Sequence, residues 1–470
     1  MTLQEEWVIR LQQKLDQGGQ VKQDAPWTKH SIYKIPSWMK DGERPNDDRI
    51  AGYTPEIISF GPYHHGQSHL SPMEAHKWRV LNHKLNREAR DISLYLTAVQ
   101  ELEHTARACY ESPVSLTSNE FVEMMVLDGC FVLEFLRGTK HGFNNLGYED
   151  NEPVFYKDSI CHVIATDLMK LENQIPLIVL EKLIEIHPNI EEVVPELVMW
   201  VLTPRWITIN APATEKHLNH MRDVVANEHG SELEPPMVHC LDVFRRSLMY
   251  NNTKPKSSPN TCCELKLLVR VRDKLKRDNC EHVMANCISD LRKAGVKFKP
   301  RYKLPFWEIK FKQCSGVLEI HPFKIDSATE TVFRNLIAFE QCHMNMSWDM
   351  VVTNYVAFMD NLIDTASDVA YLHKAGIIVH YLGSDQEVAD LFNRLVTKVY
   401  VNKKTGVLHD VYQKLNEYCS HRRSWWRASL QNEYLHNPWV IISIFAAFLL
   451  FLLTALQTGY SVYAYYKPPS

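Results

Sequence analysis

Residues 168–180 read LMKLENQIPLIVL, an apolar run interrupted by Glu172, Asn173 and Gln174 and then by Pro176. Proline lacks an amide hydrogen and clashes with the preceding helical turn, so a helix that enters this run must kink or restart. The polar trio therefore has two interpretations. It is either a structural motif that satisfies backbone groups left unpaired at a helix break, or a set of catalytic groups placed in a core. We favour the structural motif.

The surrounding sequence predicts a mainly helical fold. Glycine is scarce, and apolar residues repeat at helical spacing from Met73 to Tyr110, after a helix start at Ser71-Pro72. A second helix is expected over 119–138, ending at its glycine. A third should run from Asp158 into the interrupted run. Helical spacing resumes at 329–418, which makes the predicted body a large multi-helix unit.

One small β-hairpin and several loops are expected within the helical body, residues 31–418. Apolar and charged side chains alternate on either side of a Cys-Ser-Gly turn at 306–323, which predicts the hairpin. An amphipathic helix and a linker are expected at 1–30. Polar composition and turn residues predict loops at 139–157, 204–236 and 251–261.

The composition limits the classes of function. Lysine and arginine total 52 against 56 acidic residues, a net charge of −4, and no long basic run exists, which argues against a nucleic-acid partner. The 11 cysteines are scattered and form no CxxC pair, a pattern that favours reduced thiols. The phosphate-loop, dinucleotide, zinc-protease and serine-hydrolase fingerprints are missing from the sequence. We therefore assign no catalytic residue, cofactor or metal ligand.

The C-terminal sequence predicts a membrane anchor. Residues 439–456 form an uncharged apolar run, and at about 1.5 Å per residue a helix of this length approaches a hydrocarbon core of about 30 Å. We expect a transmembrane helix at 439–460, a juxtamembrane segment at 419–438 and a short tail at 461–470; a buried core helix is the alternative interpretation. The residues expected at the membrane interface are Arg422, Arg423, Trp425, Trp426, Arg427 and Trp439.

Two polar clusters each have a structural and a functional interpretation. The first consists of His64, His65, His69 and His76. Their spacing matches no common metal motif, so we favour a turn whose histidines bind backbone over a zinc site. The second consists of Asp360, Asp364 and Asp368, which on one continuous helix would share a face. A solvated face is favoured there over a cation or a basic partner.

Several segments carry a family resemblance when they are taken in chain order. They include SIYKIPSWMK, GYTPEIISFGPYHHG, MMVLDGCFVLEFLR, LENQIPLIVLEKL, TETVFRNLIAFEQC and the apolar C-terminal run. From about Ile32 to Pro468 the chain resembles the plant family called domain of unknown function 247. The resemblance implies a mostly helical, single-span plant protein associated with the plasma membrane, with no established catalytic residues or cofactor. Members in grasses are implicated in self-incompatibility as recognition determinants.

The leading hypothesis is a membrane-anchored, non-catalytic interaction, recognition or signalling protein of plants. It would contact the lipid bilayer through its C-terminal helix and protein partners through the loops of its body. The arginines before the apolar run place that body in the cytosol. The alternative is a membrane-bound hydrolase of unknown substrate, with Asp128 and Glu172 as a carboxylate pair and His64, His65 or His76 as base or ligand.

Overall fold

Helices make up most of the computed structural model, with two small sheets among them, as the sequence predicted. The helix and linker expected at 1–30 lie outside the described residues, except for residue 30. Of the loop expected at 204–236, residues 204–207 are the end of α9 (Val194–Ile207), so that part of the prediction is wrong. Residues 208–236 and the loop expected at 251–261 lie outside the described residues as well. The structure describes residues 30–40, 52–187, 192–207, 237–249, 287–302, 306–344, 350–401, 407–420 and 438–466.

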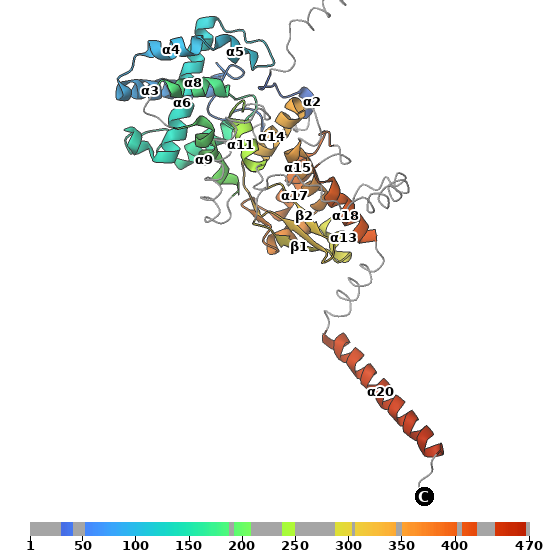
Figure 1. The fold of residues 1–470 in the computed structure, drawn as a ribbon. Helices are drawn as coiled ribbons and strands as arrows, with labels where there is room; N and C mark the ends of the chain where they lie inside the picture. Colours follow the sequence, from blue (N-terminus) through green and yellow to red (C-terminus); the bar gives the residue numbers. More distant parts are fainter. Residues whose placement is uncertain are drawn as a thin grey trace, which may run out of the picture.

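The named elements in the N-terminal half of the described chain are all helices (Figure 1). Helix α3 begins at Ser71, as predicted, but the prediction of one helix from 73 to 110 is wrong. Ala89 adopts a left-handed φ of 47°, which ends α3 and starts a turn. The helices of this half are α2 (Ser37–Lys40), α3 (Ser71–Glu88), α4 (Ile92–Gln100), α5 (Glu103–Ala108), α6 (Ser118–His141), α7 (Asp158–Asp167), α8 (Leu177–Glu185), α9 (Val194–Ile207) and α11 (Cys240–Met249), with the 3-10 turns η1 (Ser68–Leu70) and η2 (Phe143–Leu146).

Helix α6 is buried along most of its length and packs against α3, α4, α8 and α9. It starts with a reciprocal cap: the Thr117 hydroxyl accepts the Glu120 amide hydrogen, and the Glu120 carboxylate accepts that of Thr117 at 2.9 Å. The predicted end at Gly138 is wrong, because α6 continues to His141. Gly138 serves packing instead, since the Phe143 ring occupies the space that a Cβ would need.

The described part of the C-terminal half contains helices and five short strands. The predicted hairpin at 306–323 is present as β2 and β3, which pair antiparallel with Phe311 opposite Leu318. Strand β1 adds to β3 in parallel, giving the order β1-β3-β2, and β4 pairs in parallel with β5 in a second sheet. The elements are α13 (Ile288–Lys293), β1 (Lys297–Pro300), β2 (Lys310–Lys312), β3 (Val317–Ile320), β4 (Phe323–Ile325), α14 (Thr329–His343), α15 (Val351–Leu362), α16 (Ala366–Lys374), β5 (Ile378–His380), α17 (Asp385–Leu395), α18 (His409–Ser420) and α20 (Pro438–Tyr466).

The three aspartates at 360, 364 and 368 do not share a helix face, so that expectation is wrong. The chain leaves the helical conformation between α15 and α16, because Thr365 caps α16. The buried Asp368 carboxylate accepts the Thr365 amide hydrogen at 3.1 Å and its hydroxyl at 3.0 Å. The Thr-x-x-Asp spacing is a capping signature that marks this helix start in the sequence.

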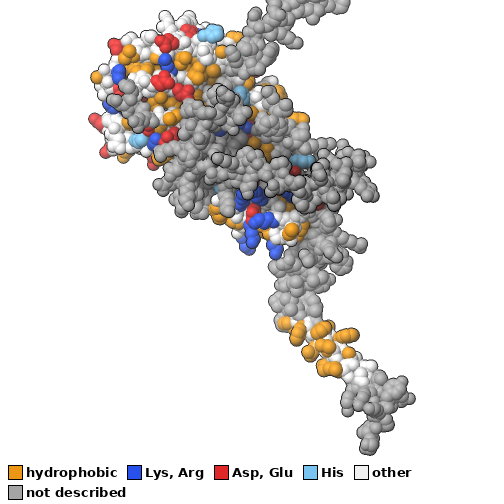
Figure 2. Space-filling view, viewed as in Figure 1, with side chains coloured by type: hydrophobic (Ala, Val, Ile, Leu, Met, Phe, Trp, Pro, Cys, Tyr) orange, Lys and Arg blue, Asp and Glu red, His pale blue; other side chains and the backbone are white. Residues whose placement is uncertain are grey.

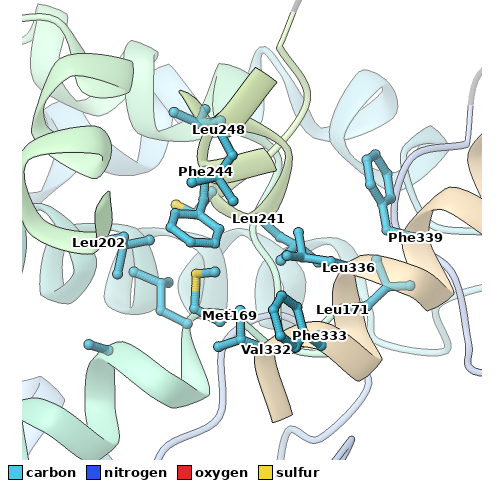
Figure 3. Close-up of a cluster of buried hydrophobic side chains, with 14 of the residues drawn as sticks. Met169, Leu171, Leu202, Leu241, Phe244, Leu248, Val332, Phe333, Leu336 and Phe339 are labelled. Atoms are coloured by element: carbon cyan, nitrogen blue, oxygen red, sulfur yellow. The ribbon is translucent and has the colours of Figure 1, made fainter. Parts of the chain in front are cut away.

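An apolar core joins the interrupted run to three helices that follow it in the sequence. Figure 3 shows Met169 and Leu171, from the segment between α7 and α8, among side chains of α9, α11 and α14. The other labelled members are Leu202, Leu241, Phe244, Leu248, Val332, Phe333, Leu336 and Phe339. The break therefore delivers apolar side chains to a core built from distant parts of the chain.

Helix α20 stands apart from the other helices and presents apolar side chains (Figures 1 and 2). Those of Phe445, Phe451 and Leu456 are each at least 68% exposed. In the described part of the chain, no helix combines the length and the apolar character needed to cross a membrane. The transmembrane helix expected at 439–460 therefore stays a prediction. The interface residues expected at 422–427 lie outside the described residues.

Candidate functional site

The interrupted run forms a polar core between two helices. Helix α7 ends at Asp167, and α8 restarts after Pro176, which occupies its N-cap position. Between them the side chains of Glu172, Asn173 and Gln174 are all buried. We use the name polar junction for these three residues together with Lys77, Asp128, Asp167 and the segment 54–61. The segment is bound by Asn173, Lys77, Asp128 and Asp167.

Asn173 and Gln174 bind backbone groups on three sides of the break. The Asn173 carbonyl oxygen accepts the Phe60 amide hydrogen at 2.7 Å, and its amide donates to Ile58 O at 3.1 Å. The Gln174 amide donates to the carbonyl oxygens of residues 168 and 170, and its own oxygen accepts the Leu241 amide hydrogen. The bonds to residues 168 and 170 satisfy carbonyl groups that the helix break leaves without a helical partner, and the others satisfy backbone groups of the segments packed against the break.

Glu172 attaches the N-terminal segment to the break. Its Oε1 accepts the Ile35 amide hydrogen at 2.7 Å and the Lys40 ammonium at 2.9 Å, and His64 Nε2 lies 3.3 Å from Oε2. Burial opposes ionisation of this carboxyl. The imidazole of His64, the Lys40 ammonium and the Ile35 amide outweigh it and lower the pKa of Glu172 to about 2. The carboxylate is therefore ionised at neutral pH and is unsuited to act as a general acid there.

Segment 54–61 has an irregular backbone that side chains hold in place. Asp167 accepts the amide hydrogens of residues 56, 57 and 58 at 2.8–3.1 Å. Lys170 donates to Thr54 O at 2.7 Å and to Asp167 at 2.9 Å. Buried backbone without strand partners needs such substitutes, because an unpaired amide in a core costs about 1–3 kcal/mol.

A buried ion pair completes the junction. Lys77 of α3 and Asp128 of α6 are both fully buried, and Lys77 Nζ lies 2.6 Å from Asp128 Oδ1. Asp128 also accepts the Gly61 amide hydrogen at 2.9 Å, and Lys77 donates to Ser59 O at 2.6 Å. Burial raises the pKa of the Asp128 carboxyl, and the Lys77 ammonium opposes that shift.

A second ionic cluster ties the same two helices together. Arg87 of α3 binds Glu134 of α6 through two hydrogen bonds of 2.7 and 2.8 Å. Lys84 lies 2.9 Å from Glu88 and 3.5 Å from Glu134. The buried Tyr148 hydroxyl donates to the same Glu134 carboxylate at 3.1 Å. The fork geometry of Arg87 fixes the register of α3 against α6.

Of the groups that the hydrolase alternative would need, Glu172 and His64 lie together, and Asp128 has partners of its own. Asp128 binds Lys77 and Gly61, whereas Glu172 binds the N-terminal segment and His64. His65 is exposed. In the residues that the structure describes, the four histidines at 64–76 do not come together as a metal-binding group. Each carboxylate of the pair is occupied by cations and amide hydrogens, so the arrangement is suited to holding backbone rather than to transferring a proton.

The sequence analysis missed the buried cations of the junction. Lys77 and Lys84 lie on the buried face of α3, the same face as Met73, Val80 and Leu81. Both lysines therefore interrupt an apolar stripe. Asp128 and Glu134 lie likewise in the most apolar stretch of α6. A charged residue inside an apolar stripe needs a buried partner of opposite charge. That pattern in the sequence could have predicted the buried ion pairs.

Glu172→Gln is expected to lower the free energy of unfolding by about 1–3 kcal/mol at pH 7, because a neutral amide no longer attracts Lys40 and His64. The folded pKa of about 2 lies below the ordinary value of 4.5, so this stabilisation is full above about pH 4.5 and disappears as the pH falls toward 2. Denaturant unfolding of both proteins at pH 7 and pH 3 measures the difference. The exposed Glu101→Gln is the matched control, and equal losses for the two variants would contradict the prediction.

The comparisons with known proteins identify relatives of uncharacterised function. A family model described as a plant protein of unknown function, DUF247, matches residues 32–453. A putative UPF0481 protein of Arabidopsis thaliana is 26% identical, with 96% of this chain and 93% of the relative covered. A second UPF0481 protein of the same plant is 26% identical, with 88% and 83% covered. No solved structure matches the chain.

Proposed function

The chain belongs to the DUF247 family of plant proteins, and on this premise we propose that it is a membrane-anchored interaction protein without catalytic turnover of its own. The observation that carries the proposal is the apolar surface of α20. Its described large apolar side chains, from Ile442 to Leu456, are 44–71% exposed. A contiguous apolar surface of this kind is unfavourable in water and marks a surface that lipid or protein covers.

Lipid is the cover that the sequence of α20 favours. The run 439–456 contains no charged residue, and tyrosines follow it at 460, 463, 465 and 466. Aromatic residues at the end of an apolar run are typical of a membrane interface. A plasma-membrane location with the body in the cytosol is part of the proposal, and it rests on the family resemblance and on the arginines at 422–427.

The non-catalytic part of the proposal rests on the polar junction. The carboxylates that sequence analysis singled out are engaged in holding segment 54–61 and the N-terminal segment in place. A general acid or base needs a proton that it can exchange with a substrate, and these groups are buried behind their partners. The helical body then serves as a scaffold whose loops recognise a protein partner, as the resemblance to self-incompatibility determinants implies.

We expect the full chain, expressed in plant cells, to stay in the membrane pellet after alkaline carbonate extraction. The double variant Leu449→Lys/Leu453→Lys should move to the supernatant, because a charge in the middle of a span costs about 2.5–3.5 kcal/mol per residue. Leu94→Lys places the same charge on an exposed leucine of α4 and should stay in the pellet.

Release of the unmodified chain, or retention of the double variant, would refute the anchor. Orientation is read from the same samples with an N-glycosidase, since Asn251 and Asn345 lie in acceptor sequons. Unchanged mobility is expected for a cytosolic body. A mobility shift would place the body in the secretory lumen and so contradict the proposed orientation.

A further inference from the structure

Three side chains of metal-ligand type converge at the end of the second sheet. His373 lies in the last turn of α16, His380 ends β5, and Asp385 is the first residue of α17. One ring nitrogen of each histidine and one carboxylate oxygen all lie within 4.8 Å of one another. Imidazole and carboxylate are ligands that divalent zinc accepts in proteins.

The backbone fixes two of the three ligands in place. His380 lies opposite Ile325 in the β4–β5 pair, and the next amide, that of Tyr381, donates to Ile325 O at 2.9 Å. Asp385 follows the N-cap Ser384, whose hydroxyl accepts an amide hydrogen of the first turn of α17. The separation between a strand end and a helix start is therefore set by main-chain hydrogen bonds.

The contacts among the three side chains leave one of them adjustable. His380 Nε2 lies 2.8 Å from Asp385 Oδ1, and the His373 and His380 rings meet edge-on with centroids 5.6 Å apart. Donor atoms around tetrahedral zinc are about 3.4 Å apart, given bonds of about 2.1 Å. The His373 side chain is exposed, so a change of its rotamer can close the remaining distance without moving the core.

A hydrogen bond between His380 Nε2 and Asp385 is the simpler interpretation of this pair. The first turn of α17 carries a second acid, Glu387, in addition to Asp385, so this helix start is negatively charged. A cation held by the two rings and Asp385 would neutralise part of that charge.

We propose that His373, His380 and Asp385 form a Zn²⁺ site that clips α16 to β5 and α17. Two imidazoles and one carboxylate leave a coordination position for water or for a ligand from outside the site. An ion that binds the folded state and not the unfolded chain stabilises the folded state by mass action. Zn²⁺ should therefore raise the melting temperature. The site is separate from the polar junction and from α20, and it does not depend on the proposed anchor.

The test uses the purified full chain in detergent, with Co²⁺ as a spectroscopic probe and Zn²⁺ as its competitor. We expect one equivalent of Co²⁺ to give visible d–d absorption that Zn²⁺ abolishes, and Zn²⁺ to raise the melting temperature. His373→Ala should weaken binding at least tenfold and remove the thermal shift. Since His373 is exposed, this variant leaves the core intact. His104→Ala, an exposed histidine of α5, is the control and should bind as the unmodified chain does.

Two results would overturn the site. Binding of His373→Ala within twofold of the control would show that the ion is held elsewhere. A thiolate-to-cobalt charge-transfer band in the near ultraviolet would assign the ion to some of the 11 cysteines instead. Asp385→Asn gives a second reading, because it removes the ligand charge while keeping the size of the side chain, and it should also weaken binding at least tenfold.

Discussion

Lys77→Met is expected to destabilise the protein by about 3–5 kcal/mol, the loss typical of leaving one member of a buried ion pair unpaired. The Lys77 ammonium lies 2.6 Å from each of three oxygens, on Asp128, Glu74 and Ser59. Methionine keeps most of the volume and removes the charge. The Asp128 carboxylate then stays fully buried with the Gly61 amide as its remaining described hydrogen-bond donor.

Denaturant unfolding followed by tryptophan fluorescence measures the effect of Lys77→Met. Lys293→Met is the matched control, because Lys293 pairs with Asp290 at 3.0 Å on the surface and should contribute less than about 0.5 kcal/mol. The double variant Lys77→Met/Asp128→Asn should recover part of the loss, since the buried charge is then gone. A loss no larger than that of the control, or a double variant less stable than the single one, would contradict the ion-pair account.

Gly61→Ala is expected to lower the free energy of unfolding by about 3–4 kcal/mol. Gly61 has a φ of 73°, a left-handed conformation that costs a residue with a side chain about 1–2 kcal/mol. An added Cβ would also lie 2.6 Å from Gln174 O and 2.8 Å from the Tyr110 hydroxyl. That hydroxyl donates to Gln174 O at 2.9 Å, so the methyl group would push apart a buried hydrogen bond.

Gly66→Ala separates the two causes, because Gly66 has a similar φ of 78° and no atom within 4 Å of an added Cβ. We expect it to cost only the backbone strain, about 1–2 kcal/mol. Thermal or denaturant unfolding measures the loss of unfolding free energy for each variant. The difference between the two losses is the contribution of the close approach of segment 54–61 to the helix break. Equal losses for Gly61→Ala and Gly66→Ala would show that this approach is looser than the structure has it.

The features that the sequence predicted correctly are those that neighbouring residues specify. Ser71-Pro72 starts α3, Asp158 starts α7, and Pro176 forces the restart before α8. The alternation at 306–323 gives the β2–β3 hairpin. In each case the deciding interaction lies within a few residues, so a local pattern is enough to predict it.

Helix ends that depend on distant packing were predicted less well. Glycine ends many helices, yet α6 continues through Gly138 to His141. The Phe143 ring packs against the backbone of Gly138, where a side chain would not fit. The prediction of one continuous helix over 73–110 failed at Ala89, whose left-handed conformation the apolar spacing did not indicate. Spacing reports which face is apolar and says little about where the axis bends.

Sequence analysis established a mainly helical chain with a small hairpin, a helix break at LENQIP and an apolar C-terminal run, because caps, proline and residue spacing act over a few positions. Tertiary structure alone decided what the break is for. Asn173 meets Phe60 across 113 residues, and Lys77 meets Asp128 across 51. Such pairings follow from which helix faces pack together, and no local pattern specifies them. The polar trio was visible in the sequence; the backbone it holds was not.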